Sequence, residues 1–161
     1  MALHEHEANG TRPRGRTVLV TGDGSLQLTM QEIGSMVHHK MKPIIILINN
    51  AGYTIERVIH GARQSYNDIF QCDYSHMLKL FGMSEKEADE SYHKATTKDE
   101  VREILSKPEL QNPARVQVVE IVMDTFDSPW RLVGQLAMRG ESSIKKMKEG
   151  GFDVPDSFLK K

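Results

Sequence analysis

An acidic side chain and an amide side chain suited to binding a metal ion lie early in the chain, each just after an apolar run. Asp23 follows the run 17–21, and Asn50 follows the run 43–48. Both runs have the character of buried parallel strands, and the segment between them is helical in pattern. In an open α/β sheet, ligands gather beyond the carboxyl ends of the strands. We therefore expect Asp23 and Asn50 to face one crevice, where oxygen donors suit a hard cation such as Mg²⁺.

A longer pattern surrounds these two residues. Residues 22–25 read GDGS, residues 49–50 read NN, residues 51–56 read AGYTIE and residues 59–61 read IHG. Asp-Gly alone is ordinary turn chemistry, but the whole combination with this spacing is specific. Over residues 16–137 the chain resembles the C-terminal, thiamine-diphosphate-binding domain of the pyruvate decarboxylase and indolepyruvate decarboxylase family, which includes enzymes acting on phenylpyruvate.

The resemblance implies a site for thiamine diphosphate and Mg²⁺. The residues that match the metal ligands of the family are Asp23, Asn50 and, through its carbonyl group, Gly52. Two diphosphate oxygens and a water molecule would complete the near-octahedral shell that Mg²⁺ requires. Gly22 and Gly24 are expected to let the backbone turn sharply and approach the phosphates.

Four further residues are assigned by the same resemblance. We expect Ser25 to be the N-cap of a helix whose amino end faces the diphosphate. Thr54 should donate a hydrogen bond to phosphate, and Ile55 should pack against the aminopyrimidine ring. Glu56 matches the glutamate that takes part in decarboxylation and proton transfer. We expect its carboxyl group to be partly desolvated, so that it holds a proton near neutral pH, and Glu56 is the predicted catalytic residue.

The implied fold class is α/β, a three-layer parallel sheet with flanking helices in the thiamine-diphosphate-binding fold. We expect a single domain over residues 1–161, of which 138–161 form the end of a C-terminal helix and a tail. One helix should place Leu26, Met30, Ile33 and Val37 on the sheet. The other expected elements are helices at 54–59, 76–81, 98–105 and 128–148, a strand at 116–123 and a mobile segment over the last ten residues.

Composition agrees with a globular domain and gives no sign of a charged partner. The chain has 161 residues, 39% hydrophobic and 27% charged, with a formal net charge of −1. This charge gives no reason to expect a nucleic-acid or membrane partner, and no apolar run has the length of a membrane helix. Cys72 is the only cysteine, so an intramolecular disulfide is excluded. The expected location is the cytoplasm.

The resemblance implies the C-terminal part of a non-oxidative 2-oxo acid decarboxylase, a carboxy-lyase. In the family, a second carboxylate that activates the cofactor comes from another domain, usually of a partner subunit, and that domain lies outside this sequence. The expected partners are therefore a 2-oxo acid substrate, once the missing domains complete the site, and either identical subunits in a homo-oligomer or full-length decarboxylase subunits.

Two alternatives stay open. The chain could be a non-catalytic stand-alone domain, or a truncated gene product that only associates with full-length subunits. A remote alternative is a short-chain dehydrogenase, because residues 18–22 and 49–52 imitate its TGxxxGxG turn and NNAG strand end. That turn needs glycine where Leu26 and Leu28 stand, and no Tyr-x-x-x-Lys pair is present.

Overall fold

The computed structural model describes residues 16–159, which form two compact units. Unit 1 contains residues 16–49 and 72–122, and unit 2 contains residues 50–71 and 123–159. Each unit is thus assembled from two separate stretches of the chain. The prediction of one domain over residues 1–161 stays a prediction, and its parts at 1–15 and 160–161 lie outside the described residues.

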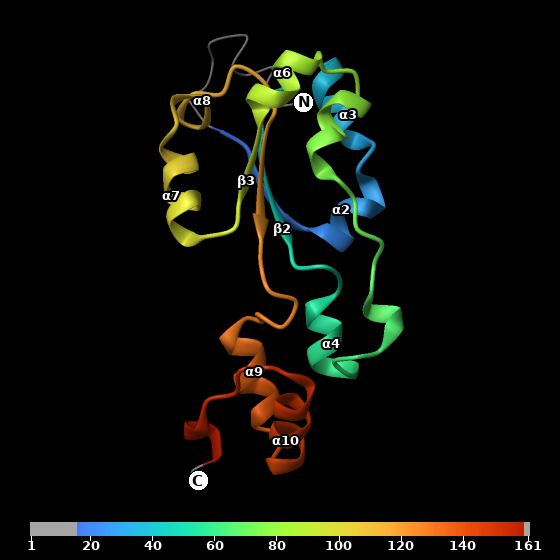
Figure 1. Cartoon of the computed structure of the whole chain (residues 1–161), viewed down its shortest axis with the longest axis vertical. Helices are drawn as coiled ribbons and strands as arrows, with labels where there is room; N and C mark the ends of the chain where they lie inside the picture. The colour runs from blue at the N-terminus through green and yellow to red at the C-terminus, as the bar shows by residue number, and fades with distance from the viewer. Residues whose placement is uncertain (1–15, 160–161) are drawn as a thin grey trace. The chain divides into compact units, whose positions relative to one another are not determined.

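Within the described residues, unit 1 is built on a four-stranded parallel sheet with the strand order β1-β2-β4-β3 (Figure 1). The strands are β1 (Val18–Gly22), β2 (Ile44–Asn49), β3 (Tyr92–Ala95) and β4 (Gln117–Val122). In the register of the ladder, Gly22 lies opposite Ile48, and Asn49 lies opposite Val122. The carboxyl ends of β1 and β2 therefore meet at the same edge of the sheet. This all-parallel sheet confirms the predicted α/β fold class.

Both faces of the sheet are covered by helices, as expected for parallel strands. Neighbouring residues of β2 face opposite layers: Ile45 belongs to one hydrophobic cluster and Ile44 to another. The Ile45 cluster includes Leu26 and Ile33, whereas Ile44 packs with Ile104. The first layer contains α2 (Asp23–Thr29), α3 (Glu32–His38), η2 (Tyr74–His76), α5 (Met77–Leu80) and α6 (Glu85–Ser91), and the second contains α7 (Lys98–Ser106) and α8 (Pro108–Gln111) (Figure 1).

Unit 2 is helical. Its core joins Val58, Val133, Ile144 and Phe152, and the ring of Phe152 meets that of Phe126 edge to face at 5.3 Å between centroids. Its elements are α4 (Thr54–His60), η1 (Ser65–Asn67), α9 (Trp130–Ala137), α10 (Glu141–Gly150) and η3 (Asp156–Leu159). None of the helices in residues 16–159 combines the length and apolar character that crossing a membrane would require.

The prediction of two buried strands is wrong for the first of them. In β1, Val18, Leu19 and Val20 are 49%, 40% and 62% exposed. The reason is that β1 lies at the edge of the sheet formed by residues 16–159, where β2 is its one partner. The side chains of Leu26 and Ile33 pack in a cluster with β2 instead. Strand β2 is buried as predicted.

Two long helices of the sequence-based prediction are each divided in the structure. The helix expected between the first two strands breaks at residues 30–31 into α2 and α3. The helix expected over residues 128–148 breaks into α9 and α10 at Gly140, whose φ of +109° a helix cannot contain. The expected mobile tail is also wrong at Phe152 and Val154, which are buried in the core of unit 2.

A buried polar chain crosses from β3 to β4. His93 is 9% exposed, and its Nε2 lies 3.3 Å from Oε1 of Gln117, whose amide donates to the hydroxyl of Ser91 at 3.4 Å. Burial lowers the pKa of His93 because the charged imidazolium is poorly solvated there. The folded protein therefore holds His93 neutral at pH values where an unfolded chain would protonate it.

His93 should make the fold sensitive to mild acid. The pKa of His93 in the folded state lies below the unfolded value of about 6.5. Its contribution to the free energy of unfolding is therefore full above a pH of about 6.5 and is lost as the pH falls from there through the folded-state pKa. Urea unfolding between pH 7.5 and 5.5 should show a loss of at most about 1.4 kcal/mol per pH unit from this group. His93→Gln should reduce the slope of the free energy of unfolding against pH, whereas the same change at the exposed His39 should not. Equal slopes in the wild type and His93→Gln would contradict this role of His93.

A second polar cluster surrounds Glu120, which is buried in the middle of β4 with 2% exposure. Asn49 at the end of β2 donates to Glu120 Oε1 at 2.7 Å, and the hydroxyl of Tyr92 on β3 donates to Oε2. Lys94 Nζ lies 3.8 Å from Oε1. Burial, with the hydrogen bond and charge of Glu120, raises the pKa of Tyr92 well above its usual range. This carboxylate thus links side chains of β2 and β3 to β4.

Removal of the Asn49 amide should destabilise unit 1. Asn49→Ala leaves a buried carboxylate with one donor fewer, which costs about 1–3 kcal/mol in the free energy of unfolding. Asn112→Ala, a change of the same type at an exposed helix end, should alter it by less than about 0.5 kcal/mol. Urea denaturation measures both, and similar losses in the two variants would show that the Glu120 cluster contributes little.

Candidate functional site

The predicted site residues fall into two sets, one in each unit. Residues 22–25 belong to unit 1, at the carboxyl end of β1, and residues 50–56 belong to unit 2, directly after β2 in the chain.

In unit 1, Asp23 is the first residue of α2 and is only 1% exposed. Its Oδ1 accepts the backbone N–H of Gly24 at 2.9 Å. An acidic residue in the first turn of a helix is favoured by the helix dipole. The sequence-based placement of an acid just beyond the first strand is confirmed.

The expected N-cap of this helix is wrong by three residues. The N-cap of α2 is Gly22, in extended conformation, and Ser25 is an exposed residue inside the first turn. The φ of −82° at Gly22 is open to any residue, so no backbone strain requires glycine there. A Cβ at Gly22 would meet no atom within 4 Å, which leaves room for a group to approach the backbone. The roles of Gly22, Gly24 and Ser25 in cofactor binding stay predictions.

In unit 2, the backbone makes a tight turn immediately after Asn50. Ala51 has a φ of +60°, unusual for a residue with a Cβ, and Gly52 has a φ of +131°. A Cβ at Gly52 would lie 2.5 Å from the carbonyl oxygen of Asn67, so only glycine fits this position. The carbonyl of Gly52 accepts the N–H of Thr54 at 3.2 Å. The glycine of the AGYTIE segment is thus required by both conformation and space.

Helix α4 begins two residues later and carries the remaining predicted residues. Thr54 is buried, and its hydroxyl donates to the carbonyl of Thr125 at 2.8 Å, so in this arrangement the predicted phosphate donor is hydrogen-bonded to the protein. Ile55 is 52% exposed. The side chain of Glu56 is 49% exposed, with Oε2 3.2 Å from Nε2 of His60 one turn later. The predicted desolvation of Glu56 is therefore small within this chain, and its catalytic role stays a prediction.

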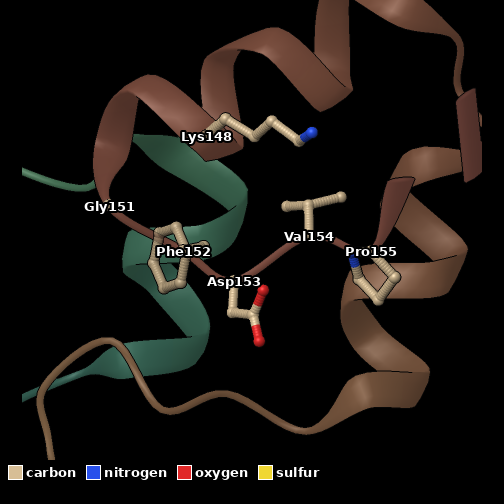
Figure 2. Close-up of a pocket in the computed structure, with 6 residues that line it drawn as sticks. All are labelled: Lys148, Gly151, Phe152, Asp153, Val154 and Pro155. Atoms are coloured by element: carbon tan, nitrogen blue, oxygen red, sulfur yellow. The ribbon is translucent and has the colours of Figure 1, made fainter.

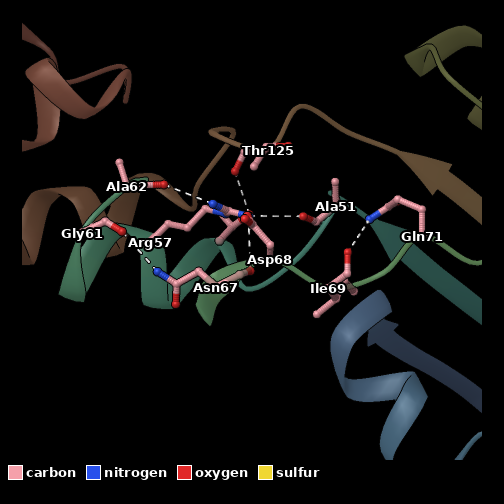
Figure 3. Close-up of polar contacts among 10 residues, drawn as sticks. Ala51, Arg57, Gly61, Ala62, Asn67, Asp68, Ile69, Gln71 and Thr125 are labelled. Atoms are coloured by element: carbon pink, nitrogen blue, oxygen red, sulfur yellow. Dashed lines mark hydrogen bonds and ion pairs between the residues drawn. The ribbon is translucent and has the colours of Figure 1, made fainter. Parts of the chain in front are cut away.

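Arg57 is the residue of this region that the sequence analysis missed. Its side chain is buried, and its guanidinium donates to the carbonyl groups of Ala51 and Asn67 and to the carboxylate of Asp68 (Figure 3). An arginine on a short helix normally indicates a solvated face. The sequence carries no signal that these acceptors, three of which are backbone carbonyl groups once Ala62 is included, lie around it.

The donor chemistry of the predicted residues fits a hard cation. Asp23 supplies a carboxylate, Asn50 an amide oxygen and Gly52 a backbone carbonyl, all oxygen donors of the kind that Mg²⁺ selects. Within residues 16–159, no group of three or more His, Cys, Asp or Glu side chains is placed to hold a metal. A ligand set with one carboxylate suits Mg²⁺, which keeps several waters or substrate oxygens.

A pocket of about 550 Å³ in unit 2 lies apart from these residues in the sequence. It is lined by Lys148, Gly151, Phe152, Asp153, Val154 and Pro155, at the end of α10 (Figure 2). None of its lining residues is a predicted site residue.

Comparison with known sequences gives one family. The family model described as thiamine pyrophosphate enzyme, C-terminal TPP binding domain, matches residues 4–118; thiamine pyrophosphate is another name for thiamine diphosphate. A putative pyruvate decarboxylase of Schizosaccharomyces pombe is 44% identical over 136 residues, and pyruvate decarboxylase isozyme 2 of Saccharomyces cerevisiae is 36% identical over 134. These matches cover 84% and 83% of this chain but only 23% of each relative. The chain thus spans about a quarter of their length.

Comparison of structures agrees on the fold. A crystal structure of benzoylformate decarboxylase from Polynucleobacter necessarius superposes with a TM-score of 0.58 and 24% sequence identity, over 80% of this chain and 23% of the other. This likeness supports the fold alone. Because the family model matches well over half of the sequence, the chain belongs to the thiamine pyrophosphate enzymes, as a C-terminal thiamine-pyrophosphate-binding domain of the pyruvate decarboxylase type.

Proposed function

We propose that this chain binds thiamine diphosphate together with Mg²⁺ and forms the cofactor-binding part of a non-oxidative 2-oxo acid decarboxylase. The observation that carries the proposal is the turn after β2. There a glycine is enforced by the carbonyl of Asn67, and an amide and a backbone carbonyl follow a parallel strand within three residues. Crevices at the carboxyl ends of parallel strands are the usual place for such ligands.

In this proposal Asp23, Asn50 and the carbonyl of Gly52 hold the Mg²⁺, which in turn holds the diphosphate. Gly22, Gly24, Ser25 and Thr54 contact the diphosphate, and Ile55 packs against the aminopyrimidine ring. When bound, thiamine diphosphate accepts the electron pair that is released when the carbon–carbon bond of a 2-oxo acid breaks and carbon dioxide leaves.

Glu56 would hold and deliver a proton during this reaction. Its carboxylate stands on the exposed side of α4 beside Ile55, and His60 is its neighbour one turn away. Coverage of this face by the rest of a decarboxylase would remove water from the carboxyl group, as proton transfer near neutral pH requires.

The proposal extends to partners and location. The pyruvate decarboxylases that the chain resembles are about four times its length, so a 2-oxo acid would bind only where the remaining domains are supplied. We propose that the partners are either full-length decarboxylase subunits, which would supply those domains, or identical subunits in a homo-oligomer, and that assembly takes place in the cytoplasm.

A non-catalytic role as an associating domain is the second candidate. It is favoured by the exposed apolar residues of the edge strand β1, Val18, Leu19 and Val20, which a partner could cover. Cofactor binding and turnover by a completed enzyme separate the two candidates, since the second requires neither.

Binding of thiamine diphosphate should depend on Mg²⁺ and on Asp23. Calorimetric titration of the cofactor into the folded chain should give a saturable signal only when Mg²⁺ is present. Asp23→Ala should weaken this binding about 10-fold to 100-fold, because a charged ligand of the metal is lost.

Asp99→Ala is the matched control for this titration. Asp99 is an exposed acid in the first turn of α7, where it is the second residue, as Asp23 is the first residue of α2. Its removal should leave cofactor affinity unchanged. Binding that is independent of Mg²⁺, or that survives Asp23→Ala at full strength, would contradict the metal site.

Glu56→Gln should abolish most turnover once the chain is joined to the missing domains of a relative. The variant keeps the size of the side chain and removes only the ability to carry a proton, so decarboxylation should fall about 10²-fold or more. The rate of product release from a 2-oxo acid measures it. Glu85→Gln, at an exposed residue of α6, is the control and should leave turnover unchanged. Near-normal turnover by Glu56→Gln would contradict the catalytic role of Glu56.

A further inference from the structure

Arg57 lies buried between two segments of unit 2 that precede and follow helix α4 in the chain. One is the turn at residues 51–53, and the other is the loop at residues 61–68. Its side chain is 7% exposed, while that of its ion-pair partner Asp68 is 62% exposed, with 2.5 Å between Nη2 and Oδ1. The buried charge is therefore balanced at the surface of the unit, and the arginine itself is enclosed by the chain.

The other bonds of the guanidinium go to backbone carbonyl groups. Nη1 donates to Ala62 at 3.1 Å, and Nη2 donates to Asn67 at 3.2 Å and to Ala51 at 3.4 Å (Figure 3). Arginine suits this task because its planar group presents several donors in fixed directions and keeps its charge at all ordinary pH values. A lysine ammonium would be a single point charge and could not reproduce the arrangement.

The carbonyl of Asn67 is the point at which the two segments meet. It accepts both the N–H of Tyr53, at 3.0 Å, and the guanidinium of Arg57, and it is also the atom that excludes a Cβ from Gly52. Asn67 is itself fixed, since it is 1% exposed and its side-chain amide donates to the carbonyl of Gly61 at 3.1 Å. The loop is thus fixed by its own hydrogen bond, and the turn is bonded to it through the carbonyl of Asn67.

The turn needs such support because its backbone is unfavourable by itself. Ala51 has a positive φ despite its Cβ, and such conformations persist only where surrounding contacts hold them. The carbonyl of that same residue is one of the acceptors of Arg57. The Nη2 group of Arg57 therefore bonds both to the strained residue of the turn and to the loop.

We propose that Arg57 is a positioning residue for the metal: it sets the turn from which Asn50 and the Gly52 carbonyl are presented, and so controls Mg²⁺ affinity without touching metal or cofactor. This inference rests on the proposed function of Asn50 and Gly52 as ligands. It assigns a role to Arg57, a buried residue of the helix that also carries Glu56.

Two readouts on the complete 161-residue chain test the inference. The first is the Mg²⁺ concentration at half-saturation of thiamine diphosphate binding, measured by calorimetry at a temperature where every variant is folded. The second is the hydrogen-exchange rate of the Tyr53 amide, which reports whether its bond to Asn67 holds, without any ligand.

Arg57→Leu should raise the half-saturating Mg²⁺ concentration more than 10-fold and accelerate Tyr53 exchange more than 10-fold relative to amides of the α9 core. Arg57→Lys should change both readouts less than Arg57→Leu does, because one charged donor remains. Val133→Ala is the control: it removes buried volume from the core of unit 2 and lowers thermal stability, but it should leave both readouts within about 2-fold.

The inference is overturned if Arg57→Leu leaves Tyr53 exchange unchanged, or if Val133→Ala weakens Mg²⁺ binding as much as Arg57→Leu does, since the effect would then be general destabilisation. Absence of Mg²⁺-dependent binding in the wild type would instead defeat the proposed function. In that case the exchange of Tyr53 still decides whether Arg57 holds the turn.

Discussion

The pairing of β2 with β4 is the constraint on which the rest of unit 1 depends. Six residue pairs join these strands, from Ile44 opposite Gln117 to Asn49 opposite Val122. Both strands carry apolar side chains on both faces, so helices must cover both sides, and the three layers follow. The ladder also fixes where β2 ends, because Asn49 in its last pair donates to the buried carboxylate of Glu120. The chain leaves the sheet at a defined point, and Asn50 is the next residue.

The two consecutive asparagines consequently have different tasks. Asn49 bonds inward to Glu120 in unit 1, whereas Asn50 begins unit 2 and is the proposed metal ligand. The same division recurs one helix later: Glu56 faces solvent beside His60, and Arg57 is buried among backbone carbonyls. In each pair, one residue is bonded within the protein and its neighbour is the proposed site residue.

The sequence predicted the parts of this molecule that depend on local pattern. Apolar runs located β1, β2 and β4, and the glycine-rich motif with its spaced asparagines located the candidate ligands. Strand β3 was missed because its four residues, YHKA, include two polar residues and form no apolar run; the burial of His93 beside Gln117 depends on the tertiary structure. The break at Gly140 was missed because a single glycine in a helical pattern does not by itself indicate a positive φ. The role of Arg57 could not be predicted, since three of its four acceptors are backbone carbonyl groups, which residue types do not identify.

The order of strands in the sheet has a kinetic consequence. β2 borders β1, which lies close to it in the chain, and β4, which is reached only after 67 intervening residues, numbers 50–116. Those residues include the first part of unit 2 and all of β3, and β3 pairs with β4 alone. Closing so large a loop is entropically slow, and parallel ladders of this kind raise the contact order. During synthesis β1 and β2 can pair early, but the sheet of four strands cannot be completed until β4 emerges. Until then the open edge of β2 and its apolar side chains depend on other molecules or on local collapse for cover.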